Sequence, residues 1–253
     1  FGASMRDVCS QLSLSMGLVS RILDSQYSGR EILAKYYDAT GADILVFYDI
    51  AASVEDKQIY EGLFKSVRAV SDLPLVAGGG LKTIEDVDNI IKLGADRVSI
   101  NTGAIDNPDL LNEAAEKIGS ENVILSVDAK KVNGEYHVFR NAGMMDTGMD
   151  ALEWISEGYD RGAGILVLNS IDTDGVKAGY DIEMLKAAGE VTDAKIVASG
   201  GAGKMQDFKE ALMLPKVEVA LAANVFHYKE IVIDDPNIIE PYNESMRSNG
   251  RVD

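Results

Sequence analysis

The stretch Val76-Ala77-Gly78-Gly79-Gly80 has a counterpart 121 residues later in the chain, Val197-Ala198-Ser199-Gly200-Gly201. In both places a short apolar run ends in a cluster of glycines, and a helical pattern follows. The same offset maps Asp86 onto Asp207, 98–105 onto 219–226, and 44–46 onto 165–167. Four coincidences at one offset indicate an internal repeat, so we expect two similar halves.

Seven short apolar runs, rich in β-branched residues, occur along the chain. They lack strict alternation of apolar and polar residues, which is typical of strands buried on both faces. The runs are 44–48, 73–77, 97–100, 123–127, 165–168, 195–198 and 217–221.

Helical patterns lie between these runs, and most are followed by a glycine that predicts the helix end. The predicted helices are 31–38 before Gly41, 84–91 before Gly94, 110–115 before Gly119, and 184–188 stopping at Gly189.

Repeated strand–helix units predict parallel strands with right-handed crossovers. The chain has 253 residues, and about 250 is typical of a (β/α)8 TIM barrel. We therefore expect α/β architecture with a single barrel domain over 1–253, made of half-barrels at roughly 1–121 and 122–253. Residues 1–10 would have to supply the eighth strand. An open doubly wound sheet is the alternative fold.

Composition excludes several classes of function. Lys and Arg number 24 against 41 Asp and Glu, for a formal charge of −17. Such a charge disfavours non-specific binding to nucleic acid or to an anionic membrane. No apolar run approaches the roughly 20 residues of a membrane span, and no signal peptide is apparent. With one cysteine and two histidines, a His/Cys metal site is disfavoured, and we expect no cofactor and a cytoplasmic protein.

The two glycine clusters are candidate phosphate sites, because each ends a strand just before a helix, where backbone N–H groups and the helix dipole attract anions. The alternative is tight turns without a ligand. Two such clusters, half a barrel apart, favour a ligand with a phosphate at each end. The candidate residues are Gly79, Gly80, Asn101 and Thr102 in one half, and Ser199, Gly200, Gly201, Ala223 and Asn224 in the other.

Asp128 ends the predicted strand 123–127, at the mouth of the barrel, where a carboxylate can act as general acid or base. Its alternative role is a helix cap or an ion pair with Lys130 or Lys131. Asp49 and the pair Asp174-Gly175 follow other strands on the same face and are further candidates, although Asp-Gly is also an ordinary turn signal.

From about residue 42 to 230 the chain resembles the cyclase subunit of imidazole glycerol phosphate synthase. The stretches that carry the resemblance are 41–43 with 47–50, 76–80, 98–102, 127–130, and 169–176 leading into 198–204, among them Val127-Asp128-Ala129-Lys130 and Asn169-Ser170-Ile171-Asp172-Thr173-Asp174-Gly175-Val176. Together they cover most of the loops that would surround the active site.

The resemblance implies a (β/α)8 barrel acting in histidine biosynthesis on a bisphosphate, phosphoribulosyl-formimino-aminoimidazole carboxamide ribotide. Ammonia from a partner glutaminase would attack it, giving imidazole glycerol phosphate and aminoimidazole carboxamide ribotide. The family uses aspartates at the ends of strands 1 and 5 as acid and base, and Asp128 matches the second.

The sequence departs from the family in two places. Residues 1–30 lack the family's opening strand motif and its loop lysine; Asp7, onto which the repeat maps Asp128, is the candidate for the first aspartate. In the family's ring of charged residues at the barrel bottom, Arg97 fits one member, whereas Ile44 and Ile165 stand where glutamates are usual.

Two alternatives to a working cyclase stay open at this point. One is a catalytically impaired barrel that binds phosphorylated ligands or serves as a scaffold for a glutaminase. The other is a related phosphate-binding barrel isomerase, or a cyclase of another pathway.

Overall fold

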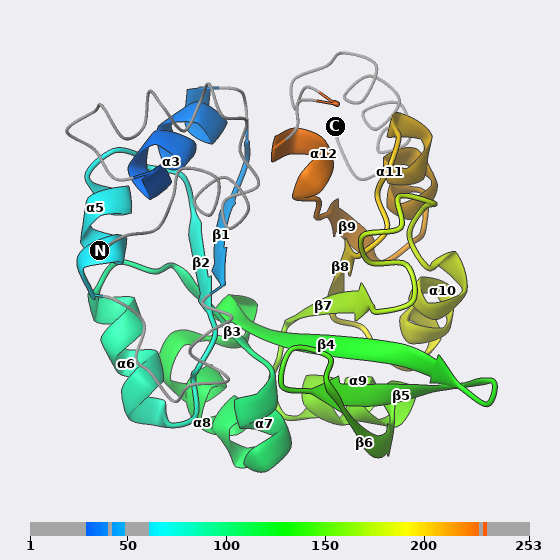
Figure 1. The fold of residues 1–253 in the computed structure, drawn as a ribbon. Coiled ribbons are helices and arrows are strands. Elements are labelled where there is room, and N and C mark those ends of the chain that lie inside the picture. The colour runs from blue at the N-terminus through cyan, green and yellow to red at the C-terminus, as the bar shows by residue number, and fades with distance from the viewer. Residues whose placement is uncertain (1–28, 40–41, 49–60, 228–229, 232–253) are drawn as a thin grey trace.

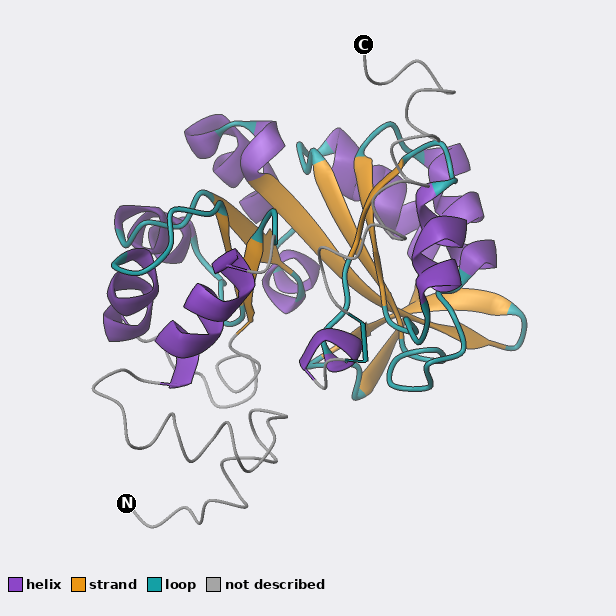
Figure 2. Ribbon diagram, turned by 90° about the horizontal axis from the view of Figure 1, so that it is seen from above, coloured by secondary structure: helices purple, strands orange, loops and turns teal. Residues whose placement is uncertain are grey.

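The computed structural model describes residues 29–39, 42–48, 61–227 and 230–231. Within them, seven parallel strands follow one another in a curled sheet in the order β1-β2-β3-β4-β7-β8-β9. Figures 1 and 2 show the sheet with helices along its outer side. This arrangement is the parallel, helix-covered architecture that the alternating pattern predicts.

The strands of the curled sheet coincide with the seven predicted runs to within a few residues, except that the fourth continues much farther. They are β1 (Leu45–Tyr48), β2 (Leu75–Gly78), β3 (Arg97–Ile100), β4 (Val123–Val132), β7 (Ile165–Ser170), β8 (Lys195–Ser199) and β9 (Val217–Ala220).

Helices separate the strands, and the predicted ones are present. The helical segments are α3 (Gly29–Ala39), α5 (Glu61–Arg68), α6 (Ile84–Lys92), α7 (Thr102–Asp106), α8 (Asp109–Ile118), η1 (Ser120–Asn122), α9 (Ala151–Asp160), α10 (Ile182–Val191), α11 (Met205–Leu212) and α12 (Asn224–His227).

The predicted end of one helix is wrong. Helix α10 runs through Gly189 and stops only at Thr192, whose backbone is extended. Burial of Met184, Leu185 and Ala188 on this helix outweighs the cost of about 1 kcal/mol for a glycine in a helix interior.

An antiparallel hairpin is the largest feature that the sequence analysis missed. Strand β4 pairs with β5 (Glu135–Arg140), which pairs with β6 (Met145–Asp150). The turn between β4 and β5 is Asn133-Gly134, and both residues have positive φ, 52° and 98°. Asn-Gly is the strongest short signal for a two-residue hairpin turn, so the sequence did carry the information.

Alternation along the strands separates two apolar clusters. Leu75, Ala77 and their equivalents pack with the helices in the larger core. A smaller cluster on the opposite, inner face of the curled sheet consists of Val76, Ile124, Val167 and Val197, with Ile44, Ile165 and Leu221 packed against it. The inner face is thus filled with branched side chains, as in the interior of a barrel.

The internal repeat is also visible in the structure. Asp86 accepts hydrogen bonds from the backbone N–H groups of Lys82 and Thr83, both 3.0 Å. Asp207, 121 residues later, accepts from those of Gly203 and Lys204, both 2.9 Å. The two halves therefore begin corresponding helices in the same way, which supports a barrel of two similar halves.

The predicted eighth strand, residues 1–10, lies outside the described residues. Within the described part, no helix is long and apolar enough to cross a membrane.

Candidate active site

Asp128 lies on the inner face of the sheet, because its neighbours Val127 and Ala129 belong to the outer core. The prediction that Asp128 ends its strand is wrong, because β4 continues to Val132 as the first arm of the hairpin. Asp128 is instead the point where pairing changes, lying opposite Asn169 on one side and Phe139 on the other.

Two amide side chains hold the Asp128 carboxylate. Asn101 Nδ2 donates to Oδ2 at 2.8 Å, and Asn169 Nδ2 donates to Oδ1 at 3.0 Å. The alternative ion pair with Lys131 is absent, since Lys131 Nζ lies 2.6 Å from Glu183 Oε1.

Burial raises the pKa of the Asp128 carboxyl above its usual range, while the hydrogen bonds from Asn169 and Asn101 act in the opposite direction. The charge of Asp174 adds to the rise in the pKa. A carboxyl whose pKa is brought toward neutrality can both give and take a proton, as a general acid or base must.

Asn169 was not among the predicted site residues, yet it connects Asp128 to Ser199. Ser199 Oγ donates to Asn169 Oδ1 at 3.2 Å, and this bond orients the amide so that its nitrogen faces Asp128. Asn169 and Ser199 lie at the ends of neighbouring parallel strands, beside Asp128 on the same face, so position at the strand end is the signal that could have found Asn169.

Tyr48 is a second ionisable group on the inner face, at the end of β1. Its hydroxyl lies 3.1 Å from Ser99 Oγ, and its ring occupies the space that a Cβ on Gly78 would fill, 2.7 Å from two ring carbons. Burial raises the pKa of the Tyr48 phenol, and hydrogen bonding to Ser99 opposes that shift. The phenol is therefore a neutral hydrogen-bonding group in the site.

The first glycine loop follows β2. Gly79 and Gly80 have positive φ, 100° and 69°, a conformation that glycine adopts without strain. This loop contacts the start of helix α7, since a Cβ on Gly103 would lie 1.9 Å from the Leu81 carbonyl oxygen. The hydroxyl of Thr102 accepts from the backbone N–H of Asn141 at 3.2 Å.

The second glycine loop follows β8, and the loop after β7 packs against it. Gly200 and Gly201 have φ of 80° and 117°. Thr173 Oγ1 donates to the Gly200 carbonyl at 3.0 Å, next to Asp174 and Gly175. The predicted residues Asp174, Ser199 and Gly200 are therefore brought together with Asp128, within one region of the inner face.

Several predicted residues cannot be placed in this way. Asp7 and Asp49 lie outside the described residues. Ala223 is exposed before helix α12, and Asn224 is its first residue. Within the described part, no group of three or more His, Cys, Asp or Glu residues gathers as metal ligands would.

Comparison with known proteins agrees with this geometry. Residues 23–232 match the model of a family described as "Histidine biosynthesis protein". Two curated relatives carry the name "Imidazole glycerol phosphate synthase subunit HisF". The protein from Oceanobacillus iheyensis is 45% identical over 202 residues, covering 79% of each chain. The protein from Clostridium beijerinckii is 42% identical over 205 residues, covering 80% of this chain and 81% of its own.

The family-model match covers the seven parallel strands, the polar residues around Asp128 and both glycine loops. The chain belongs to the family of HisF, the cyclase subunit of imidazole glycerol phosphate synthase in histidine biosynthesis, whose fold is a (β/α)8 barrel.

Proposed function

We propose that this chain converts phosphoribulosyl-formimino-aminoimidazole carboxamide ribotide and ammonia to imidazole glycerol phosphate and aminoimidazole carboxamide ribotide, with Asp128 as one acid/base group. The observation that carries the proposal is the Asp128 carboxyl, buried on the inner face between two amide donors, with a raised pKa. Family membership supports the reaction, and the position of Asp128 supports its role as an acid/base group.

Asp128 transfers protons during ring closure and cleavage, and Asn101 and Asn169 hold its two oxygens in place. Asp7 is proposed as the second acid/base group on the first strand. The phosphates of the substrate bind the two glycine loops, where N–H groups carry no side chain in front of them. These are Gly79 and Gly80 with Asn101 and Thr102, and Ser199, Gly200 and Gly201 with Asp174, Gly175, Ala223 and Asn224; Asp49 is a further candidate for substrate contact.

Ammonia is proposed to come from a glutaminase that forms a heterodimer with this chain in the cytoplasm. The relatives are named as subunits, which supports a partner chain. We expect the chain to bind neither nucleic acid nor a membrane.

The test is turnover of the purified chain on the bisphosphate substrate, with ammonium salt as the nitrogen source. The proposal expects both products in equal amounts without a glutaminase. Substrate that binds but is never converted would contradict it.

One observation favours a second candidate function, a barrel that binds the substrate but is impaired in ammonia use. Arg97 lies on the inner face, and its Nε atom is buried with no hydrogen-bond partner among the described residues. Ile44 and Ile165 belong to the inner apolar cluster at that level, so neither supplies a carboxylate. In that case, turnover would be retained with ammonium salt, which bypasses the ring, and absent with a glutaminase as the ammonia source.

A further inference from the structure

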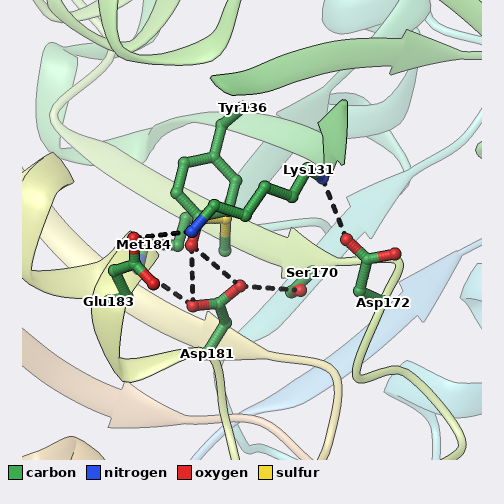
Figure 3. A network of polar contacts seen from close by, with 7 residues as sticks. All are labelled: Lys131, Tyr136, Ser170, Asp172, Asp181, Glu183 and Met184. Carbon is green, nitrogen blue, oxygen red and sulfur yellow. Dashed lines mark hydrogen bonds and ion pairs between the residues drawn. The ribbon is translucent and has the colours of Figure 1, made fainter. Parts of the chain in front are cut away.

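The hairpin formed by β4 and β5 lies beside the loop that connects β7 to α10, residues 171–181. Figure 3 shows the polar network between them. The hairpin starts in the same strand as Asp128, and the loop begins two residues after Asn169. The network therefore joins two segments that both extend from the centre of the site.

Asp181 is the centre of this network and the N-cap of α10. Its carboxylate accepts from Tyr136 Oη at 3.0 and 3.2 Å, from Ser170 Oγ at 3.2 Å and from the Met184 backbone N–H at 3.0 Å. A cap needs only the last of these contacts. The other two attach the end of the loop to the hairpin and to the end of β7.

The Tyr136 hydroxyl acts only as a hydrogen-bond donor in its contact with Asp181. Its side chain is buried, and burial together with the hydrogen bond to Asp181 keeps the pKa of the phenol far above its usual value. A hydrogen bond to a carboxylate is stronger than one between neutral groups, and this one joins residues 45 positions apart.

The beginning of the same loop is fastened as well. Asp172 Oδ2 accepts from the Lys131 backbone N–H at 2.9 Å. Lys131 Nζ also pairs with Glu183 and lies 5.2 Å from the centre of the Tyr136 ring. The hairpin thus holds the loop at both ends, at Asp172 and at Asp181.

The middle of the loop contacts the second glycine loop. Thr173 Oγ1 donates to the Gly200 carbonyl at 3.0 Å, and the Gly179 N–H donates to the Gly201 carbonyl at 2.9 Å. A Cβ on Gly201 would lie only 2.1 Å from the Gly179 oxygen. Movement of residues 171–180 would therefore move the backbone that is proposed to bind a phosphate.

We propose that Tyr136 and Asp181 are positioning residues that hold the loop 171–180 in the conformation needed for the phosphate of the substrate at Gly200 and Gly201. This inference rests on the proposed phosphate site. Neither residue needs to touch the substrate, because both act through the loop, and their contribution is to substrate affinity rather than to the proton-transfer step.

Tyr136→Phe is the first test, since it keeps the ring in the core and removes only the hydroxyl. We expect the KM for the bisphosphate substrate to rise three- to tenfold in ammonium-supported turnover, with kcat within twofold of the unchanged protein. We also expect faster hydrogen exchange of amides in 171–180. Asp181→Ser keeps a cap acceptor for Met184 but cannot reach Tyr136. It should give the same rise in KM with little change in kcat, even if Tyr136→Phe fails to fold.

Glu183→Gln is the matched control, because it removes an ion pair in the same helical turn whose partners are exposed, 36% and 72% for Lys131 and Glu183. Exposed pairs contribute little, so its KM and its exchange should stay unchanged. Unchanged KM in both Tyr136→Phe and Asp181→Ser would overturn the inference, as would faster loop exchange without a change in KM.

Failure of the proposed function is distinguishable from failure of this inference. If the unchanged protein shows no turnover, the cyclase proposal fails, and binding of inorganic phosphate is measured instead. Weaker phosphate binding in Tyr136→Phe, but not in Glu183→Gln, would still support positioning of the loop. Equal binding in all three proteins would overturn it.

Discussion

Asp128 is a buried carboxylate whose contacts on the described residues are two amide groups and no cation. Its pKa is raised chiefly by burial, so the folded protein holds the Asp128 proton more tightly than the unfolded chain does. Stability from this group is greatest below the unfolded pKa, about 3.9, and is lost as pH rises through the folded pKa.

Asp128→Asn should therefore unfold at a higher temperature than the unchanged protein at pH 7, with a smaller difference near pH 4. The unpartnered Asn101 Oδ1 allows Asn101 to turn over and accept from the new amide. Thermal unfolding of both proteins at the two pH values checks this. A variant that is less stable at pH 7 would contradict the assigned cause of the raised pKa.

Ser199→Ala should lower kcat about three- to tenfold and shift the pH profile of kcat to higher pH. Without the Ser199 hydroxyl, Asn169 loses the bond that aims its nitrogen at Asp128, and a weaker donor leaves the pKa of Asp128 higher. The pH dependence of kcat is the measurement, and Ser199→Thr, which keeps the hydroxyl, is the control. Loss of substrate affinity alone would instead assign Ser199 to phosphate binding.

Part of the site could be read from residues alone. Asp128, Asn101, Ser199 and Asp174 were predicted and lie together, but their roles stay predictions. Asn169 carries no motif of its own, and the pairing of β4 with β7 is what places it opposite Asp128. Tyr136 was missed because its carboxylate, Asp181, is 45 residues away in a loop, and only the folded structure brings the two together.

At the scale of elements, the repeat places Asp86 and Asp207 in the same role but in different surroundings. Each accepts two backbone N–H groups before its helix. Asp207 is only 3% exposed, whereas Asp86 is half-buried and its hydrogen bonds are exposed. The equivalent hydrogen bonds of Asp86 and Asp207 should therefore contribute unequally to the free energy of unfolding.

Asp86→Ala should lower the free energy of unfolding by about 1 kcal/mol, the usual contribution of a helix cap. Asp207→Ala should cost about 2–3 kcal/mol, because it empties a buried side-chain position and removes two hydrogen bonds that are part-buried. Urea denaturation of the two variants gives both values. Equal losses in the free energy of unfolding would mean that the greater burial of Asp207 adds nothing to its contribution to stability.

Gly201→Ala should lower stability and raise the KM for the substrate, because φ is 117° and the new Cβ would lie 2.1 Å from a carbonyl oxygen. Gly189→Ala is the matched control, since nothing lies within 4 Å of its Cβ position in helix α10. That change should add about 0.5–1 kcal/mol to the free energy of unfolding. Urea denaturation and steady-state kinetics separate the two variants.

The seven parallel strands were predictable because each is a short apolar run between helical patterns. Helix α10 was predicted too short because Gly189 suggested a stop, whereas the buried residues around it hold the helix together. Strands β5 and β6 were missed because their apolar signal is weak: only Tyr136 and Val138 of β5 are buried, and no residue of β6 is.

At the scale of the whole molecule, the described strands form a curled parallel sheet with an apolar inner cluster and polar strand ends. Repeat, strand count and chain length all predicted this arrangement, and family membership identifies it as the (β/α)8 barrel of HisF. A single domain over 1–253 with half-barrels at 1–121 and 122–253 stays a prediction, because residues 1–10, predicted to supply the eighth strand, lie outside the described residues.

The central claim is that Asp128 transfers protons in a cyclase whose substrate is bound at the two glycine loops. The most direct measurement compares the unchanged protein with Asp128→Asn in ammonium-supported turnover, alongside substrate binding by calorimetry. We expect kcat to fall by roughly 10²–10⁴, the usual effect of a general acid/base, with the dissociation constant of the substrate within a few-fold. An Asn variant that retains full turnover would contradict the account.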